Sequence, residues 1–134
     1  MKSLTLVLWL FVFLPCFSEG RKHTTGNDLA KNCKFLFAEL NGSKPTTLSA
    51  SEEIDTGYCE GFLEGVIDEE QSLAQSLRWV ETESTSGHFC LPENSTQEQL
   101  LRLLKKWMDK HPEQLHKSGE FVIHEALAEV FPCK

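Results

Sequence analysis

Apolar residues recur every three or four positions in four segments of this chain, as they do along one face of an α-helix. The pattern predicts helices at residues 28–41, 50–78, 96–110 and 119–131. Strand-like alternation is absent, and runs of β-branched residues are short. We therefore expect an all-α domain over residues 27–133, a small disulfide-stapled bundle of four main helices in which short loops join antiparallel neighbours.

Each predicted helix has an expected start and an expected buried face. Side-chain oxygens just before a helix can accept hydrogen bonds from its first free amides. The candidate caps are Asn27 or Asp28, Ser49 or Ser51, Ser95 with Glu98 in a capping box, and Ser118. The expected core residues are Leu29, Cys33, Leu36, Phe37 and Leu40, then Leu100, Leu103, Leu104, Trp107 and Met108, and finally Phe121, Val122, Leu127, Val130 and Phe131.

Gly57, Gly61 and Gly65 are spaced four residues apart in the second predicted helix, so they share one face. Each glycine costs about 1 kcal/mol relative to alanine in a helix interior, so the stripe needs a reason. A face without side chains lets another backbone approach, and we expect close packing there, within the chain or across a dimer. Such stripes also pair helices in membranes, but interleaved acids such as Glu60 and Glu64 argue against that setting.

Residues 1–20 have the pattern of a secretory signal peptide. Lys2 precedes the apolar run LTLVLWLFVFLPCF, and small residues follow it. We expect cleavage after Ser18 or Gly20. A retained anchor is the alternative, but the run is shorter than the ~20 residues that span a bilayer, and Cys16 stands in a poor context for lipidation.

The net charge of the chain indicates which class of partner it binds. The chain has 20 acidic and 13 basic residues and a formal net charge of −7. Nucleic-acid binding needs clustered Lys and Arg, so the composition argues against it and favours a basic partner. Eight acids lie between Glu52 and Glu70, and Lys44 is the only basic residue from Asn41 to Leu77. Such a run is commonly a solvated helix face, and a binding surface is the alternative.

Four cysteines, Cys33, Cys59, Cys90 and Cys133, remain after the expected cleavage. An even number in an exported protein predicts two disulfides, and no pair has the Cys-x-x-Cys spacing of a zinc or redox site. Cys33 and Cys59 each lie roughly 10–12 Å along their helices from the first hairpin turn. Cys90 precedes the third helix and Cys133 follows the fourth. Of the three possible pairings, antiparallel hairpins therefore predict Cys33–Cys59 and Cys90–Cys133.

No motif predicts catalysis, a metal or a cofactor. The cysteines are assigned to bridges, and no Gly-x-Ser-x-Gly elbow exists. His111 and His116 are five apart and flank Pro112, which fits no zinc-binding helix; we expect them to cap carbonyls or loops. The stretch HFCLPENSTQEQLLRLLKKWMDKHPEQLH (88–116) is thus interpreted as a structural corner, and the protein as a non-enzyme.

A series of short motifs runs through the chain in a specific order and spacing. They are Cys59-x-Gly61-Phe62 with Gly65 and Asp68, Phe89-Cys90-Leu91-Pro92, His111-Pro112-Glu113 with Leu115-His116, Ala126-Leu127, and Phe131-Pro132-Cys133. Together they resemble the Rap/Tai family of bacterial immunity proteins of type VI secretion, and the resemblance covers roughly residues 30–133.

The resemblance implies a small, helical, disulfide-bonded periplasmic protein that binds a toxin delivered by neighbouring cells, often as a homodimer. Several such toxins are amidases that cut cell-wall peptides, and the immunity protein plugs their active-site groove. Loops that contact the toxin differ between members, and residues 78–89 are polar and peculiar to this chain. The expected partner-binding residues are Glu60 and Glu64 on the second helix and Trp79, Glu81, Glu83 and His88 in the loop.

Three other interpretations remain at this stage. A periplasmic interaction or envelope module of the same fold would lack a toxin gene beside its own. A small secreted hydrolase or toxin would degrade cell-wall fragments when purified. A eukaryotic secreted protein would carry glycans on Asn41 or Asn94, each of which begins an Asn-x-Ser/Thr triplet.

Overall fold

The computed structural model describes residues 22–43, 46–77 and 89–133. These residues form the α-helices α1 (Gly26–Asn32), α2 (Lys34–Leu40), α3 (Ala50–Leu77), α4 (Gln97–Lys110) and α5 (Gly119–Ala128), with a 3₁₀ turn η1 (Pro112–Gln114). In these ranges β-type pairing is limited to isolated bridges of Thr25 with Ser118 and of Phe89 with Pro132. The prediction of an all-α protein is therefore confirmed.

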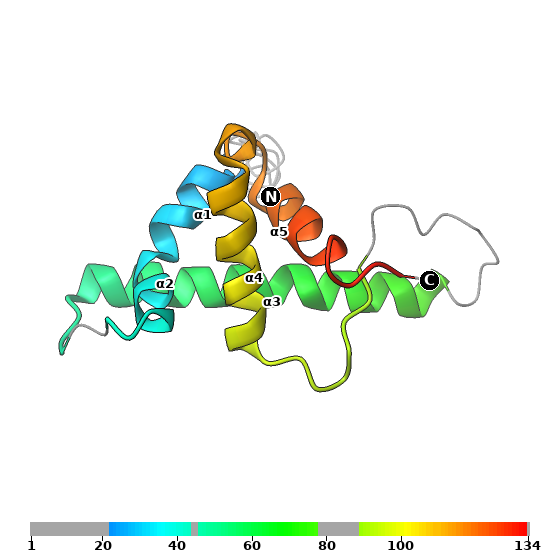
Figure 1. The fold of residues 1–134 in the computed structure, drawn as a ribbon, viewed down its shortest axis with the longest axis horizontal. Coiled ribbons are helices and arrows are strands. Elements are labelled where there is room, and N and C mark those ends of the chain that lie inside the picture. Colours follow the sequence, from blue (N-terminus) through cyan, green and yellow to red (C-terminus); the bar gives the residue numbers. More distant parts are fainter. Residues whose placement is uncertain (1–21, 44–45, 78–88, 134) are drawn as a thin grey trace, which may run out of the picture.

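Helix α3 packs against α1, α2 and α5. Figure 1 shows it along the long axis of the molecule, with α4 crossing it and with α1–α2 and α5 on opposite sides of α4. The core lies where these helices meet, and its fully buried side chains are Leu29, Cys33, Cys59, Leu63, Leu104, Val122, Ile123 and Leu127. None of the helices in the described part of the chain combines the length and apolarity needed to cross a membrane.

The first predicted helix is wrong in one respect, because two short helices replace it. The backbone of Cys33 has a ψ of −2°, far from the roughly −42° of an α-helix. That residue ends α1 and precedes α2. The apolar positions continue at helical spacing through Cys33, from Leu29 to Leu36 and Phe37, so their periodicity gave no sign of the break. The main helices therefore number five in the described residues, not four.

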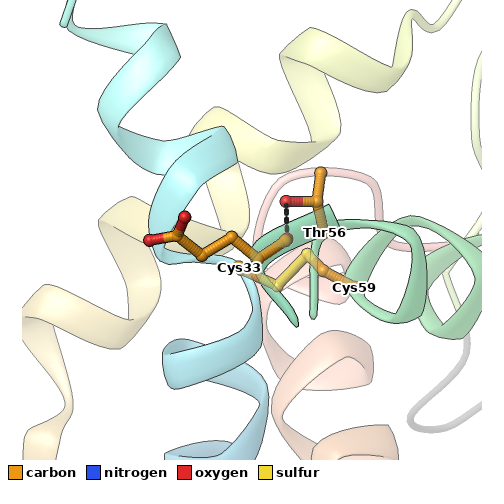
Figure 2. The surroundings of a disulfide bond; sticks show 4 residues. Cys33, Thr56 and Cys59 are labelled. Atoms are coloured by element: carbon orange, nitrogen blue, oxygen red, sulfur yellow. Dashed lines mark hydrogen bonds between the residues drawn. A yellow bond between two sulfur atoms is a disulfide. The ribbon is translucent and has the colours of Figure 1, made fainter. Parts of the chain in front are cut away.

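The two predicted disulfides are confirmed. The Cα atoms of Cys33 and Cys59 lie 5.1 Å apart, and those of Cys90 and Cys133 lie 4.9 Å apart. Figure 2 shows the first bridge joining the junction of α1 and α2 to α3, next to Thr56. The Thr56 hydroxyl donates to the Glu52 carbonyl at 2.7 Å, so it is satisfied within its own helix. The first bridge thus links the α1–α2 junction to α3, and the second links the segment before α4 to the segment after α5.

Two of the four predicted caps are shifted by a few residues. Ser49 and Ser118 cap α3 and α5 as expected. In α1 the cap is Thr25, and Asp28 is the third helical residue that bonds back to it. In α4 the capping box is Thr96 with Gln99, one residue after the predicted pair. Adjacent hydroxyl and acid residues satisfy the same sequence pattern, so packing decides the register.

Helix α5 is shorter than predicted, and this leaves Val130 outside the core. The helix ends at Ala128, and the Phe131 carbonyl accepts a hydrogen bond from the Cys90 amide at 2.8 Å. The chain leaves the helix to make this contact beside the Cys90–Cys133 bridge. Val130 is consequently 47% exposed, contrary to its predicted burial.

The glycine stripe of α3 does not pack against another described segment, which contradicts the expected close contact within the chain. A Cβ atom placed on Gly57, Gly61 or Gly65 would meet nothing within 4 Å, and all three residues are exposed. Helix α3 buries the opposite face, through Cys59, Leu63 and Val66 among others.

Candidate functional site: an acidic hollow between three helices

Helix α3 brings negative charge to the surface beside α2 and α4. It contains eight acidic residues and no Lys or Arg. The predicted binding residues Glu60 and Glu64 lie one turn apart on this helix, Glu60 partly buried and Glu64 exposed. The start of α3 is fixed by a capping box in which the Ser49 amide donates to the Glu52 carboxylate at 2.8 Å.

Glu60 lines a hollow of about 290 Å³ at the junction of α2, α3 and α4. Apolar wall residues come from α2 and α4, and three carboxylates come one from each helix. The lining residues are Leu36, Leu40 and Leu101, with Glu39, Glu60, Glu98 and Gln97. We call this site the acidic hollow. Residues far apart in the sequence meet here because α2 packs against both α3 and α4.

Hydrogen bonds connect the rim of the acidic hollow to its neighbours. The Gln97 side-chain amide donates to Glu64 at 3.4 Å, which brings the second predicted acid to the rim. The Arg102 guanidinium donates to Glu98 at 2.7 Å, so the charge of that carboxylate is partly offset. Among the described residues that line the hollow there are three glutamates and no Lys or Arg, so acidic side chains are in excess there.

The arrangement suits a long basic side chain from a partner. The stem of Lys or Arg is apolar and packs on aliphatic groups, while its head seeks carboxylates and water. Leucines and glutamates in one hollow offer both surfaces. In the described part of the chain, no group of three or more His, Cys, Asp or Glu residues is placed to hold a metal ion.

The outer face of α3, next to the acidic hollow, is smooth and partly apolar. Ile54 is 72% exposed and Tyr58 is 44% exposed beside the glycine stripe. Tyr58 stacks on Phe62, with ring centroids 5.8 Å apart, and its hydroxyl shares a hydrogen bond with Thr24. Tyr58 is therefore held in place by contacts with the folded body.

The histidines fill local structural positions. His116 Nδ1 lies 2.8 Å from the Glu113 carbonyl, as expected for a histidine that caps a turn. His111 ends α4 and stacks on Trp107, with centroids 4.6 Å apart. His124 Nδ1 lies 3.8 Å from the buried carboxylate of Glu70. These positions pair the rings with carbonyls, an aromatic ring and a carboxylate.

The structure brings together only part of the predicted binding set. Glu60 and Glu64 meet at the acidic hollow, whereas Trp79, Glu81, Glu83 and His88 lie outside the described residues. Sequence reasoning missed Glu39 and Glu98, which line the hollow with Glu60. For Glu39 the sequence offered one signal, the predicted first disulfide, which sets α2 beside α3. That disulfide does not place α4, so it gave no signal for Glu98.

Comparison with known proteins agrees with this architecture. The family model of Rap1a immunity proteins matches residues 25–133. No curated protein and no solved structure matches the chain. The match spans all five helices and both disulfides. The chain therefore belongs to the Rap1a immunity protein family.

Proposed function

We propose that this chain is a periplasmic immunity protein that neutralises a cognate effector of type VI secretion, a peptidoglycan amidase, by covering its active site. Family membership supports the immunity role. Export through the signal peptide pattern of residues 1–20 would place the protein where such an amidase acts. In this proposal the protein binds its target and has no catalytic activity of its own.

The observation that carries the mode of binding is the acidic hollow. Its carboxylates lie beside an exposed helix face that has no basic residue. A basic side chain on the rim of the toxin's active-site groove would enter the hollow, and the acidic face of α3 would steer the toxin into place. Complementary charge of this kind raises association rates and fixes the orientation of a complex.

Rigid positioning supports an inhibitor that works by occlusion. One disulfide ties the α1–α2 junction to α3, and the other ties the segment before α4 to the segment after α5. The Thr25–Asp28 and Thr96–Gln99 capping boxes fix helix starts. A surface held in its binding conformation loses less entropy when the complex forms. The second predicted contact, the loop with Trp79, Glu81, Glu83 and His88, remains part of the proposal and would enter the catalytic groove.

A capture experiment tests the proposal. The full chain, exported by a bacterial host so that its disulfides form, carries a C-terminal tag and is mixed with proteins secreted by the source cells and their relatives. We expect one tightly bound cell-wall hydrolase whose amidase activity falls to zero at a one-to-one ratio. Recovery of envelope components alone would favour the module without a toxin partner.

A charge-reversed variant then tests the site. Glu60→Lys with Glu64→Lys should weaken toxin binding strongly. Glu93→Lys with Glu125→Lys, which alters net charge by the same amount at exposed positions elsewhere, should leave it unchanged. Equal affinity of both double variants would move the contact away from the acidic hollow. Sedimentation equilibrium of the purified protein tests the predicted homodimer separately.

A further inference from the structure

A second, larger hollow lies on the other side of α4 from the acidic hollow. It has a volume of about 430 Å³ and lies between the segment that precedes α4 and the segment that follows α5. Its apolar surface comes from Pro92, Leu103, Val130 and Phe131, and Arg102 is the one charged residue among the described residues of its lining. We call this site the C-terminal groove.

The C-terminal groove leaves apolar surface in water. Val130 is 47% exposed and lines the groove. Leu103 is only partly buried on α4, where Leu100, Leu101 and Leu104 already supply the core contacts. Leu103 and Phe131 pack partly against the core, yet both also line the groove, so part of this apolar surface stays available to another molecule.

The walls of the groove are held in fixed positions. The Cys90–Cys133 bridge joins the two segments, and the Cys90 amide donates to the Phe131 carbonyl at 2.8 Å. On the other wall, the Ser95 hydroxyl donates to the Pro92 carbonyl at 2.8 Å. A preformed apolar concavity with a few polar groups is the usual form of a ligand site.

The charged residues at the C-terminal groove indicate which kind of segment it binds. The chain has an excess of acids, yet none of the described residues that line this groove is acidic. Arg102 stands in its lining, and Lys106 lines a small hollow of about 40 Å³ that shares Leu103 and Val130 with it. Arg102 pairs with Glu98, whereas Lys106 forms no ion pair with any residue that the structure describes. The groove thus combines an apolar floor with a cationic edge.

We propose that the C-terminal groove binds a short segment of a partner protein in which an aliphatic or aromatic side chain lies next to an acidic residue. The apolar side chain would cover Leu103 and Val130, and the carboxylate would pair with Lys106 and Arg102. The groove volume of about 430 Å³ accommodates a few side chains. Its apolar floor and cationic edge match a segment that carries one apolar and one acidic side chain, and a short peptide can supply both.

The groove is separate from the site proposed for the toxin. The acidic hollow attracts cations on one side of α4, and the C-terminal groove attracts an acidic segment on the other. A variant in one site leaves the lining of the other unchanged, apart from the shared Glu98–Arg102 pair. Either proposal can therefore fail without the other.

Selection from a random library of 12-residue peptides displayed on phage tests the proposal, because the partner's sequence is unknown. The exported full chain with oxidised disulfides serves as the target. We expect enriched peptides to share an apolar residue next to Asp or Glu. Their affinity should fall at least tenfold in Val130→Asp and about threefold in Lys106→Gln. Tyr58→Asp, which alters an equally exposed apolar residue on α3, should not affect binding.

Three outcomes would overturn the proposal. These are the absence of any enriched peptide, enriched peptides that lack an acid, and enriched peptides that bind Val130→Asp as well as the wild type. Sedimentation of the free protein tests the other possible occupant of the groove, a second copy of this chain. A dimer that Val130→Asp abolishes would assign the groove to a second copy. Thermal unfolding of each variant confirms that it is folded, which we expect because Val130, Lys106 and Tyr58 are exposed.

Discussion

Gly61 lies in the middle of the outer face of α3, where an added Cβ atom would contact nothing within 4 Å. Alanine is about 1 kcal/mol more favourable than glycine inside a helix. We therefore expect Gly61→Ala to raise the free energy of unfolding by about 1 kcal/mol, measured by urea denaturation with the disulfides intact. Stability lost in this variant would show that the stripe packs in the free protein after all.

Gly119 is a control for Gly61, because a side chain added at Gly119 would meet neighbouring atoms. A Cβ atom there would lie 2.9 Å from Phe62 Cε1 and 3.4 Å from the Thr24 carbonyl. The contact with the ring is too short, so Phe62 must move when alanine is introduced. We expect Gly119→Ala to lower the free energy of unfolding while Gly61→Ala raises it. The same substitution with opposite signs separates helix propensity from packing.

Two capping carboxylates make stability depend on pH. Hydrogen bonds from the Thr25 amide and then its hydroxyl lower the pKa of Asp28, and the Ser49 amide and hydroxyl do the same for the pKa of Glu52. The unfolded chain then binds more protons than the folded one. Their stabilisation is fully present above the ordinary carboxyl pKa of about 4 and is lost as pH falls through the lowered values.

This linkage predicts a flatter acid response for Asp28→Asn with Glu52→Gln. Between about pH 5 and pH 3 the double variant should lose less of its free energy of unfolding than the wild type, because neither group can titrate. Glu125→Gln, at an exposed position that caps no helix, is the control and should follow the wild-type curve. Parallel curves for the double variant and the wild type would assign the acid response to other groups.

At the scale of elements, the two disulfides should contribute unequally. The Cys90–Cys133 bridge spans 43 residues and the Cys33–Cys59 bridge spans 26, and loop entropy favours the longer span by only about 0.4 kcal/mol. Cys33 and Cys59 are fully buried, so their removal also leaves a cavity, which costs more than that difference.

Replacement of both residues of a bridge by alanine tests this order. We expect Cys33→Ala with Cys59→Ala to lose more than the roughly 2–4 kcal/mol typical of a bridge, and Cys90→Ala with Cys133→Ala to lose less than the first pair. Urea denaturation of the two double variants measures both. A larger loss for the Cys90–Cys133 pair would mean that the attachment of the C-terminal segment matters more than core packing.

The bounds of the two central helices were accessible from the sequence because they depend on local periodicity, and the disulfide pairing followed from the antiparallel order of the helices. The bounds of α3 and α4 agree with the predicted 50–78 and 96–110 within about one residue. The break at Cys33 and the early end of α5 were not accessible, because each lies at a tertiary link that local periodicity does not report. These links are the bridge from Cys33 to Cys59 and the hydrogen bond between Cys90 and Phe131. The exposure of Val130 follows from the second link.

At the scale of the whole molecule, the fold separates charge around α4. The acidic hollow and the face of α3 carry carboxylates, whereas the C-terminal groove on the other side carries Arg102 in its lining. Sequence analysis identified Glu60 and Glu64 from the one-sided charge of their helix. It could not assemble Glu39 and Glu98 with them, because that requires the positions of α2 and α4 across α3.

A cation placed in the acidic hollow by mutation tests whether a basic side chain of the toxin binds there. Glu60→Lys places a positive group in the hollow where the toxin's basic side chain would lie, whereas Glu60→Gln only removes the negative charge. Loss of attraction in Glu60→Gln should weaken toxin binding by about tenfold, or ~1.4 kcal/mol. Glu60→Lys adds repulsion and competition, so we expect a larger loss of affinity. Its affinity should also decrease less than that of the wild type when salt is raised.

Titration calorimetry of the captured toxin at low and high salt measures both effects. If the two variants bound equally well and kept the wild-type salt dependence, the cation of the toxin would not enter the hollow, and variants of Trp79, Glu81, Glu83 and His88 would be the next test of where the proteins meet.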